Sequence, residues 1–548
     1  MDKNELKDLL KIIPLPENIH NGNFLIKFDM DKIDLNTFSF FFETIVEAYP
    51  NSEFLALPDV ISLEGIDEEN LDKFIYDWYT ETKREIEKIE FKKKIPYDVK
   101  LILNTLEDNG YPAYVVGGCC RDILLEKTPK DWDITTAATP DQIIDCFKDR
   151  YKIIPTGLQH GTVTVVINRI GYEITTFRID GEYSDHRRPD SVEFTTDIIK
   201  DLARRDFTMN AIAFGLKEGF IDPFNGKDHI FLLDSNIRCV GNPDDRFKED
   251  PLRILRAWRF SCQSKTKGDS SIHFQTLKSA KSNIKLLSNI SKERIRDEFV
   301  KALYDPKGFV YTTLHYNFFL FAVVPEFEAG EKFNQNNPYH IYDVLNHTLI
   351  ALRALEKEDD IITKLAVLFH DIGKPCCYQE DKDGIGHFYG HAKVGAEMTD
   401  KIMRDLKFDN KTRESVVELI KYHDATFVES KAAVNRWLNK IGQEQFKRLL
   451  RMRLADIRGQ SIVYFEDRKK NIDKMEELLA QVLRENTCFQ MRNLEINGND
   501  LINLGFTESR ELGEAKKKLF EMVMNLEIPN DRGVLLEEAK KILKERKN

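Results

Sequence analysis

Residues 114–122 of this chain read YVVGGCCRD, and residues 130–134 read KDWDI. Val115 and Val116 end an apolar run, which predicts a buried strand. Gly117 and Gly118 allow the backbone to approach a phosphate closely, and Arg121 falls in the first turn of the helix expected next. A strand, a glycine turn and a helix that carries an arginine together predict a binding site for a triphosphate.

Asp131 and Asp133 add a second feature directly after this turn. They stand two residues apart, and the chain continues as Ile134-Thr135-Thr136, so on a strand both carboxylates point to the same face. Such a pair can hold divalent metal in a phosphoryl-transfer site, where one ion activates the attacking oxygen and another steadies the leaving group. Most Asp-x-Asp pairs are solvated turn residues, so this interpretation depends on motifs elsewhere in the chain.

Two further motifs follow in order along the chain. Residues 201–211 read DLARRDFTMNA, and residues 249–260 read EDPLRILRAWRF. With the first stretch, these motifs resemble the class II tRNA nucleotidyltransferases, which are the CCA-adding enzymes and their poly(A) polymerase relatives. The resemblance runs from about Lys94 to Asn548. It implies that Asp131 and Asp133 are catalytic and hold Mg²⁺.

Acidic and basic side chains recur along the helix expected after residue 250. Asp250, Arg253, Arg256 and Arg259 stand three residues apart, so neighbours lie adjacent on one helix face. The simplest interpretation is an exposed, ion-paired face. The family resemblance implies instead that Asp250 and Arg253 read the edge of the incoming base through paired hydrogen bonds. It also implies that Arg205, Arg256 and Arg259 bind phosphates of the incoming nucleotide.

Residues 177–189, which read FRIDGEYSDHRRP, form a polar, glycine-containing stretch between expected strands. A surface loop is the simple interpretation. The stretch also resembles the family's flexible loop, which enzymes that add only C lack and which helps to switch specificity from C to A. Glu173 lies on the expected strand over residues 173–178 and is a candidate third catalytic carboxylate, although a solvated strand face explains it nearly as well.

Histidines indicate a second chemistry, because six of the chain's twelve fall between His340 and His423. His370 and Asp371 follow the apolar helix expected over residues 361–369, which places them at its C-terminal end. An ordered set resembles the HD phosphohydrolase superfamily and comprises His347, His370, Asp371, His391, His423, Asp424 and Asp456.

This second resemblance implies a metal site with mixed nitrogen and oxygen donors, for which Mn, Ni, Co, Fe and Mg are all suitable. The expected ligands of the first ion are His347, His370, Asp371 and Asp456. His391 and His423 match the additional histidines of HD enzymes and would hold a second ion or a phosphate. A retained metal site does not by itself establish a physiological substrate.

Composition agrees with a large enzyme outside the membrane. The 548 residues, 42% of them apolar, suffice for several domains with their own cores. The longest apolar run, Phe318 to Val324, is too short to span a bilayer. Charges interrupt the first thirty residues, unlike a secretory signal peptide, so a cytoplasmic location is expected. The eight cysteines form no zinc-type pairs and are expected to be free thiols.

The net charge of −11 is concentrated at the N-terminus. Residues 1–90 hold 21 of the 92 acidic residues and 9 of the 81 basic residues, a net charge of −12. The other 458 residues hold 71 acidic and 72 basic residues and are nearly neutral. Any contact with RNA must therefore use local basic patches, such as Arg204-Arg205 or Lys516-Lys517-Lys518.

The expected fold class is an α/β nucleotidyltransferase head followed by an all-α neck, HD domain and tail, with a small α+β N-terminal extension. Residues 494–505, which read LEINGNDLINLG, resemble the start of the family's C-terminal pattern. The expected segments are an acidic N-terminal domain of unknown role and unknown partner (1–92), the head (93–235), a neck that binds RNA and nucleotide (236–334), the HD domain (335–460) and a helical tail that binds tRNA (461–548).

Together, the motifs predict a CCA-adding tRNA nucleotidyltransferase, which adds C, C and A to the tRNA 3′ end from CTP and ATP without a nucleic-acid template. An accessory HD phosphohydrolase site is expected beside it. Within the class, a poly(A) polymerase or A-adding enzyme is the alternative, because the same carboxylates and arginines serve all three. From other classes, the chain could act mainly as an HD phosphohydrolase on cyclic or terminal phosphates, or the acidic N-terminal segment could make it chiefly an assembly module.

Overall fold

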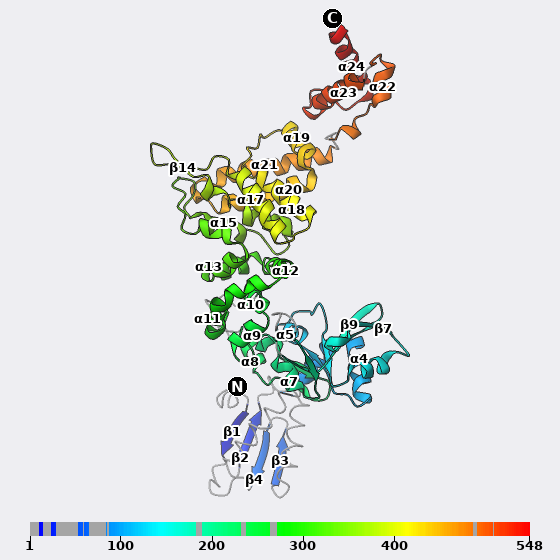
Figure 1. Cartoon of the computed structure of the whole chain (residues 1–548), viewed down its shortest axis with the longest axis vertical. Coiled ribbons are helices and arrows are strands. Elements are labelled where there is room, and N and C mark those ends of the chain that lie inside the picture. The colour runs from blue at the N-terminus through cyan, green and yellow to red at the C-terminus, as the bar shows by residue number, and fades with distance from the viewer. Residues whose placement is uncertain are drawn as a thin grey trace. The chain divides into compact units, whose positions relative to one another are not determined.

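The structure is a computed structural model, drawn as a ribbon in Figure 1. The chain divides into two compact units. One unit contains Met1–Ile179, Phe194–Leu202 and Asn210–Lys227, and the other contains Asp180–Glu193, Ala203–Met209 and Asp228–Asn548. The structure describes four strands near the N-terminus, residue 84, and residues 87–547. Within the last range, it does not describe residues 182, 184–188, 232–236, 264–270, 486–489 and 508.

Four antiparallel strands form a sheet near the N-terminus, in the order β1-β2-β4-β3. Their bounds are β1 Leu10–Pro14, β2 Phe24–Phe28, β3 Glu53–Leu57 and β4 Val60–Glu64. These strands are the β part of the small α+β extension expected at the N-terminus.

A seven-stranded sheet forms the head, in the order β13-β12-β5-β6-β9-β8-β7. Its strands are β5 Ala113–Val116, β6 Ile134–Thr136, β7 Lys152–Gly157, β8 Thr162–Ile167, β9 Ile170–Thr176, β12 Ala213–Gly215 and β13 Gly219–Ile221. Neighbouring strands are antiparallel except β6 and β9, which run parallel. The strand expected over residues 173–178 corresponds to the end of β9 and the start of β10 (Arg178–Asp180).

Strand β5 lies in the middle of this sheet, and all four of its residues are buried. The next residue, Gly117, has φ +80° and ψ −125°, a backbone conformation that only glycine adopts readily. Its N–H donates to the carbonyl of Ile212 on the way into β12. The chain thereby turns directly from β5 into helix α5 (Gly118–Leu124), as the glycine pair predicts.

Helices α4 (Tyr97–Asp108) and α6 (Pro140–Phe147) pack against the head sheet. Helix α6 begins where its sequence predicts a start: Thr139 forms a capping box with Gln142, and Pro140 occupies the first turn. A cap of this kind typically stabilises a helix by about 1 kcal/mol.

The neck consists of helices that pack around one tryptophan. Its helices are α9 Pro243–Glu249, α10 Leu252–Gln263, α11 Phe274–Asn283, α12 Lys292–Ala302, α13 Pro306–His315 and α14 Phe318–Val323. Trp258 on α10 is fully buried, and its ring lies 6.2 Å from Phe299, 5.2 Å from Phe309 and 6.0 Å from Phe319. These aromatic contacts join α10 to α12, α13 and α14.

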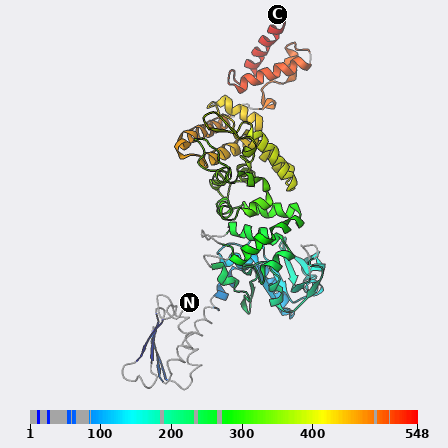
Figure 2. The ribbon, with the colours of Figure 1, turned by 60° about the vertical axis from the view of Figure 1, so that its left-hand side comes forward.

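The HD region is a bundle of helices, coloured green to orange in Figure 2. Its helices are α15 Val344–Arg353, α16 Ile361–Phe369, α17 His391–Asp405, α18 Asn410–Tyr422, α19 Lys431–Ile441, α20 Gln443–Arg458 and α21 Phe465–Arg484. Helix α16 has the bounds expected from the sequence and packs against α15, α18 and α20. Asp343, Asp360 and Asp409 cap the N-termini of α15, α16 and α18 through side-chain oxygens.

Three helices form the tail: α22 (Gly498–Asn503), α23 (Ser509–Met524) and α24 (Arg532–Lys547). Leu501, Leu519 and Leu535, one from each helix, belong to a shared buried cluster. Helix α22 begins with a capping box between Asn497 and Asp500, so its N-terminus is a regular helix start.

In the part of the chain that the structure describes, no helix has the length and apolar character to cross a bilayer. The seven described cysteines are free thiols. Cys119 and Cys120 are buried at the start of α5, whereas Cys376 is exposed.

Candidate nucleotide and metal sites

Asp131 and Asp133 are both exposed in the segment directly before β6. The sequence predicted that both residues lie on a strand. Strand β6 begins only at Ile134, so the pair precedes the strand and this prediction was wrong. The backbone ladder nevertheless extends to Asp133, because its carbonyl accepts a hydrogen bond of 3.0 Å from the N–H of Val116. The end of β5, where the glycine turn begins, is thereby tied to the carboxylate pair.

Glu173 lies on the strand next to this pair. Strands β6 and β9 are parallel with Ile134 opposite Ile174, and extending that register by one residue aligns Asp133 with Glu173. Ile134 and Ile174 are buried, whereas Asp133 and Glu173 are exposed. Aligned residues of neighbouring strands share a face of the sheet. The register therefore supports a third carboxylate beside the Asp-x-Asp pair.

Arg121 is the fourth residue of α5 and is largely buried, with a side chain 17% exposed. Its Nε and Nη2 donate to one oxygen of Asp122 at 3.0 and 2.7 Å. Its Nη1 donates to Asn210 Oδ1 at 2.7 Å. These partners fix the plane of the guanidinium one helical turn after the glycines.

Asp250 ends α9 and caps the next helix of the neck. One carboxylate oxygen accepts from the N–H of Leu252 at 3.1 Å, and the other pairs with Arg294 at 2.8 Å. Arg253 pairs with Glu249 at 2.6 Å. The two residues expected to read the base are thus each held by a neighbour of opposite charge.

Arg256 and Arg259 lie on the same helix and are also paired. Arg256 Nη2 lies 2.6 Å from Asp206, and Arg259 Nε lies 2.6 Å from Glu298. Burial would lower the pKa of Arg256, but the charge of Asp206 outweighs it and raises that pKa. The expected ion-paired face is therefore real, but it is largely buried and not exposed. Arg205 follows α7 (Ile198–Ala203) and is half-buried.

The expected flexible loop is described only at its ends, because residues 182 and 184–188 lie outside the described residues. At its start, Gly181 N–H donates to the carbonyl of Ser191 at 2.9 Å. Tyr183 donates its hydroxyl proton to Asp180 at 2.7 Å, and Asp180 also lies 3.6 Å from Arg204. Burial is the main cause that raises the pKa of Tyr183.

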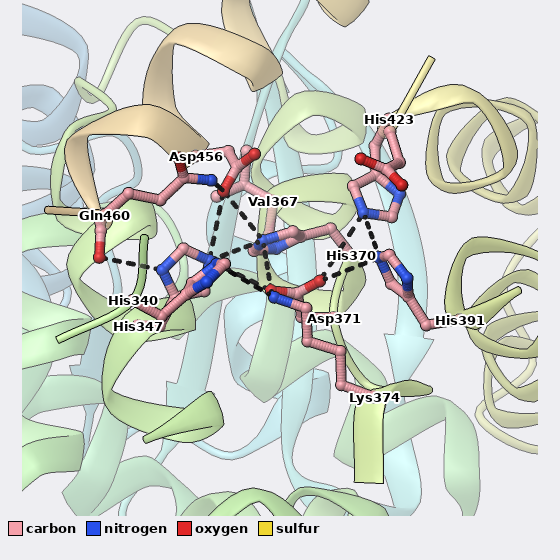
Figure 3. Close-up of polar contacts among 12 residues, drawn as sticks. His340, His347, Val367, His370, Asp371, Lys374, His391, His423, Asp456 and Gln460 are labelled. Atoms are coloured by element: carbon pink, nitrogen blue, oxygen red, sulfur yellow. Dashed lines mark hydrogen bonds and ion pairs between the residues drawn. The ribbon is translucent and has the colours of Figure 1, made fainter. Parts of the chain in front are cut away.

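Four side chains from three helices meet in the HD region (Figure 3). His347 comes from α15, His370 and Asp371 follow α16 directly, and Asp456 comes from α20. His347 Nε2 lies 3.1 Å from His370 Nε2, 3.1 Å from Asp371 Oδ2 and 3.2 Å from Asp456 Oδ1. All four predicted ligands of the first ion are brought together.

A second group shares Asp371 with the first. His391 begins α17 and His423 follows α18, and their Nε2 atoms lie 3.1 Å apart. Asp371 Oδ1 lies 3.5 Å from His391 and 3.6 Å from His423, while its Oδ2 faces the first group. The carboxylate of Asp371 thus stands between two sets of donors, as Figure 3 shows.

Each of the four histidines presents the same ring nitrogen to the centre. Their Nδ1 atoms lie 2.7–2.9 Å from backbone carbonyls, those of Gly459, Val367, Phe388 and Ile420. A carbonyl only accepts, so each Nδ1 carries a proton and donates it. Every Nε2 is therefore available as a metal ligand, the arrangement that second-shell hydrogen bonds impose on metal-binding histidines.

Buried carboxylates set the electrostatics of this cluster. Burial would lower the pKa of His370, but the charge of Asp371 and hydrogen bonds outweigh it and raise that pKa to about 10. Burial would raise the pKa of Asp371, but His370 and Lys374 hold it well below its usual range. The cluster therefore requires compensating positive charge, which either protons on the histidines or metal cations can supply.

The donor set fits a metal ion. Asp371 Oδ2 is buried, with Lys374 Nζ 2.7 Å away and the Nε2 atoms of His347 and His370 each 3.1 Å away. Because the Nδ1 atoms of both imidazoles carry the protons, their Nε2 lone pairs face this carboxylate, which is costly unless a cation lies between them. Imidazole and carboxylate together suit first-row transition metals.

Three residues beside the cluster were not assigned a role from the sequence. Lys374 is buried, and its Nζ lies 2.8 Å from Gln335 Oε1 and 3.2 Å from His340 Nε2. Burial, with the charge of Lys374, lowers the pKa of His340 to about 3. The position of Lys374, three residues after Asp371, could have identified it from the sequence as a neighbour of the cluster. Nothing in the sequence marks Gln335, because only the fold brings it near the cluster.

Gly373 sets how closely α17 approaches the cluster. A Cβ at Gly373 would lie 2.6 Å from the backbone N of Gly395 and 2.7 Å from the carbonyl of His391. We expect Gly373→Ala to displace the backbone of the ligand His391 and to weaken metal binding by about tenfold or more. Metal titration followed by elemental analysis of the purified protein measures this effect.

Gly395 provides a matched control on the opposite side of the same contact. A Cβ there would find its nearest neighbours at 3.5 Å, which is ordinary van der Waals distance. Gly395→Ala should therefore leave metal affinity unchanged. Equal affinities for the two variants would contradict the claim that this contact positions His391.

Comparison with known families divides the chain in the same order as these sites. The poly A polymerase head domain matches residues 113–231. The probable RNA and SrmB-binding site of polymerase A matches residues 271–330. The HD domain matches residues 339–458.

Individual relatives extend the match over most of the chain. A CCA-adding enzyme of Lactobacillus helveticus is 34% identical over 433 residues, 78% of this chain and 93% of that protein. One of Ligilactobacillus salivarius is 32% identical over 83% of this chain and 98% of its own. The crystal structure of the Bacillus stearothermophilus CCA-adding enzyme in complex with CTP is 26% identical, with a TM-score of 0.59 over 81% of this chain and 97% of that one. With its three-part domain order and near-complete coverage of these relatives, the chain belongs to the CCA-adding enzyme family.

Proposed function

We propose that this chain adds C, C and A to the 3′ end of tRNA, using CTP and ATP and no nucleic-acid template, in the cytoplasm. Near-complete coverage of CCA-adding relatives at more than 30% identity carries this proposal. We assign the segments as residues 93–235 for the head, 236–334 for the neck, 335–460 for the HD domain and 461–548 for the tail, which follows the order of the matched families.

In the transfer reaction, the tRNA 3′ hydroxyl attacks the α-phosphate of the nucleotide and pyrophosphate leaves. Asp131 and Asp133 would hold Mg²⁺, which when bound activates the attacking oxygen and steadies the leaving group. Glu173 stands beside them in the sheet register. Gly117, Gly118 and the fixed guanidinium of Arg121 would cradle the triphosphate, so that positioning and charge neutralisation supply most of the rate.

Addition to a tRNA that lacks CCA tests this function directly. The purified chain is incubated with such a tRNA and with CTP alone, ATP alone, or both nucleotides. A CCA-adding enzyme extends by two residues with CTP alone and completes the end only when ATP is also present. An A-adding enzyme needs a substrate that already ends in CC, and a poly(A) polymerase adds long A tails. Either of those patterns would replace the proposal by its alternative.

Base selection provides a sharper prediction for the neck. If Asp250 and Arg253 read the base edge, Asp250→Ala should lose discrimination against UTP and GTP, at about 1–3 kcal/mol for each lost hydrogen-bonded pair. Competition between all four nucleotides measures the ratio of incorporation. By the same proposal, Arg205, Arg256 and Arg259 bind phosphates of the incoming nucleotide through their guanidinium groups.

Arg294→Ala is the control for this experiment, because Arg294 is the ion-pair partner of Asp250. It removes the pairing while leaving the carboxylate that is proposed to contact the base. A nucleotide ratio that stays constant in Asp250→Ala would mean that Asp250 only caps α10, as its hydrogen bond to Leu252 already allows.

The HD centre supports a second candidate function, a metal-dependent phosphohydrolase. The observation that favours it is the complete set of buried imidazole and carboxylate donors arranged around Asp371. We propose that Mn, Ni, Co, Fe or Mg binds to His347, His370, Asp371 and Asp456, and that a second ion or a phosphate binds to His391 and His423. A metal there would supply an activated water and neutralise phosphate charge. Lys374 would hold the orientation of Asp371.

A further inference from the structure

Glu298 is a buried carboxylate that faces the arginines of α10. It lies on α12, which packs against α10, and its side chain is 5% exposed. Its Oε2 accepts a hydrogen bond of 2.6 Å from Arg259 Nε, and its Oε1 lies 3.3 Å from Lys301 Nζ. The next residue of α12, Phe299, packs its ring 6.2 Å from that of Trp258 on α10. The ion pair of Glu298 and Arg259 therefore adjoins the aromatic core of the neck.

Three contacts hold the guanidinium of Arg259. Its Nε donates to Glu298, and its Nη1 donates to Gln263 Oε1 at 3.4 Å. Its Cζ lies 4.0 Å from the ring centre of Phe260. Gln263 in turn donates its amide N–H to the carbonyl of Lys301, near the end of α12, at 2.9 Å. Helix α12 thus supports this guanidinium directly through Glu298 and indirectly through Gln263.

Arg256 belongs to the same arrangement of charges. Its Cζ lies 5.4 Å from the ring centre of Phe260, the ring that Arg259 also contacts. Burial would lower the pKa of Arg256, but the charges of Asp206 and then of Glu298 outweigh it and raise that pKa. Glu298 therefore acts on both arginines of α10 that are proposed to bind phosphates, on Arg259 by contact and on Arg256 by charge.

Stability alone does not account for a buried ion pair at this position. Removing two charges from water costs about as much as their attraction returns, and well-packed apolar residues often replace such a pair without loss. What the carboxylate adds is orientation, because its hydrogen bond to a guanidinium is charge-assisted and directional. An arginine that is already oriented loses less side-chain entropy when it binds a phosphate.

We propose that Glu298 is a positioning residue of the nucleotide transfer reaction, which holds Arg259 by contact and Arg256 by charge in the orientation that meets the phosphates of the incoming nucleotide. The inference rests on the proposed transferase function. Glu298 acts through the arginines and not on the base, so its effect is the same for CTP and ATP, which carry the same triphosphate. This distinguishes Glu298 from Asp250, whose loss is expected to change the choice of base.

The test measures the addition of CMP to a tRNA that lacks CCA and of AMP to a tRNA that ends in CC, each with the full chain and at varied nucleotide concentration. Glu298→Gln keeps the volume and one acceptor oxygen but removes the charge, and should raise KM for both nucleotides about threefold. Glu298→Ala should raise both KM values about tenfold, with kcat within about twofold of wild type. Asp297→Ala is the matched control, because it removes the neighbouring, exposed carboxylate of α12, and should leave both KM values unchanged.

A double variant separates positioning from packing. Glu298→Met with Arg259→Met replaces the buried pair by two apolar side chains, so that neither charge of the pair is left without its partner. Its Tm should return to that of wild type, whereas KM for CTP and for ATP should stay raised about tenfold, because the proposed phosphate contact of Arg259 is lost. Recovery of the wild-type KM together with the Tm would overturn the inference, because Glu298 would then only compensate the charge of Arg259.

Binding of CTP with Mg²⁺, measured by isothermal titration calorimetry, gives a readout that does not depend on transfer. The Kd should be about tenfold higher for Glu298→Ala than for wild type and for Asp297→Ala. If wild type adds no nucleotide to tRNA but this difference in Kd is found, the proposed function fails and the role of Glu298 stands. Equal Kd and equal KM in wild type, Glu298→Gln and Glu298→Ala would contradict that role.

Discussion

Replacing Asp131 or Asp133 by alanine is expected to abolish nucleotide addition, lowering CMP incorporation into tRNA by about a thousandfold or more. The physical reason is that the loss of either carboxylate would remove a ligand of the proposed Mg²⁺, and phosphoryl transfer depends on the charge neutralisation that this ion would supply. Incorporation of labelled CMP into a tRNA that lacks CCA measures the effect.

The fold and tRNA affinity should survive these substitutions. Both side chains are exposed and precede β6, so their removal creates no cavity in the sheet. Asp149→Ala is a suitable control, because it removes another exposed carboxylate of the head and should leave activity intact. Thermal melting and a tRNA gel-shift assay check the expectation for folding and binding. Robust CMP incorporation by a variant that carries both Asp131→Ala and Asp133→Ala would show that the Mg²⁺ site of the transferase lies elsewhere.

Local sequence patterns predicted much of the fold because they reflect local physics. The apolar run before Gly117 became β5, and Gly117 adopts the positive φ that its place in the turn demands. The apolar residues 361–369 form α16 with those bounds, followed by His370 and Asp371. In each case, neighbouring residues alone determine burial and backbone conformation, so the pattern suffices.

The partners of the neck arginines could not be predicted in this way. Arg256 pairs with Asp206, fifty residues earlier, and Arg259 pairs with Glu298, thirty-nine residues later. Such pairs depend on how helices pack, and a three-residue spacing carries no information about it. The spacing predicted one face of α10 correctly, but the degree of its burial came only from the fold.

The bridging position of Asp371 was equally beyond the sequence. The family resemblance already separated the four ligands of the first ion from His391 and His423, but only the fold places the two oxygens of Asp371 against the two groups. That arrangement depends on α18, which packs against both α16 and α17. Because both groups of donors share Asp371, the loss of this residue is expected to lower the metal content of the whole centre.

Replacing His370 and Asp371 together by alanine is expected to remove bound transition metal and any phosphodiesterase activity against 2′,3′-cyclic nucleotides, while CCA addition remains largely intact. The proposed transferase and HD sites draw their ligands from segments more than 200 residues apart. Each assembles its own donors and phosphate contacts, so any coupling would have to pass through packing or tRNA placement. Elemental analysis and parallel assays of the two activities measure the separation.

Single substitutions resolve the two groups of donors within the HD centre. If Asp371 bridges two ions, His423→Ala should lower metal content from two ions to one per chain, since the donors His347, His370 and Asp456 remain, whereas Asp371→Ala should lower both affinities. If a phosphate occupies the second group, His423→Ala should leave metal content unchanged and weaken phosphate binding. Arg404→Ala serves as the control, because Arg404 is an exposed ion-pair residue of the adjoining helix α17.

A His370→Ala, Asp371→Ala double variant that stays folded but loses CCA addition would contradict the two-site interpretation, because the histidine cluster would then have to belong to the transferase itself.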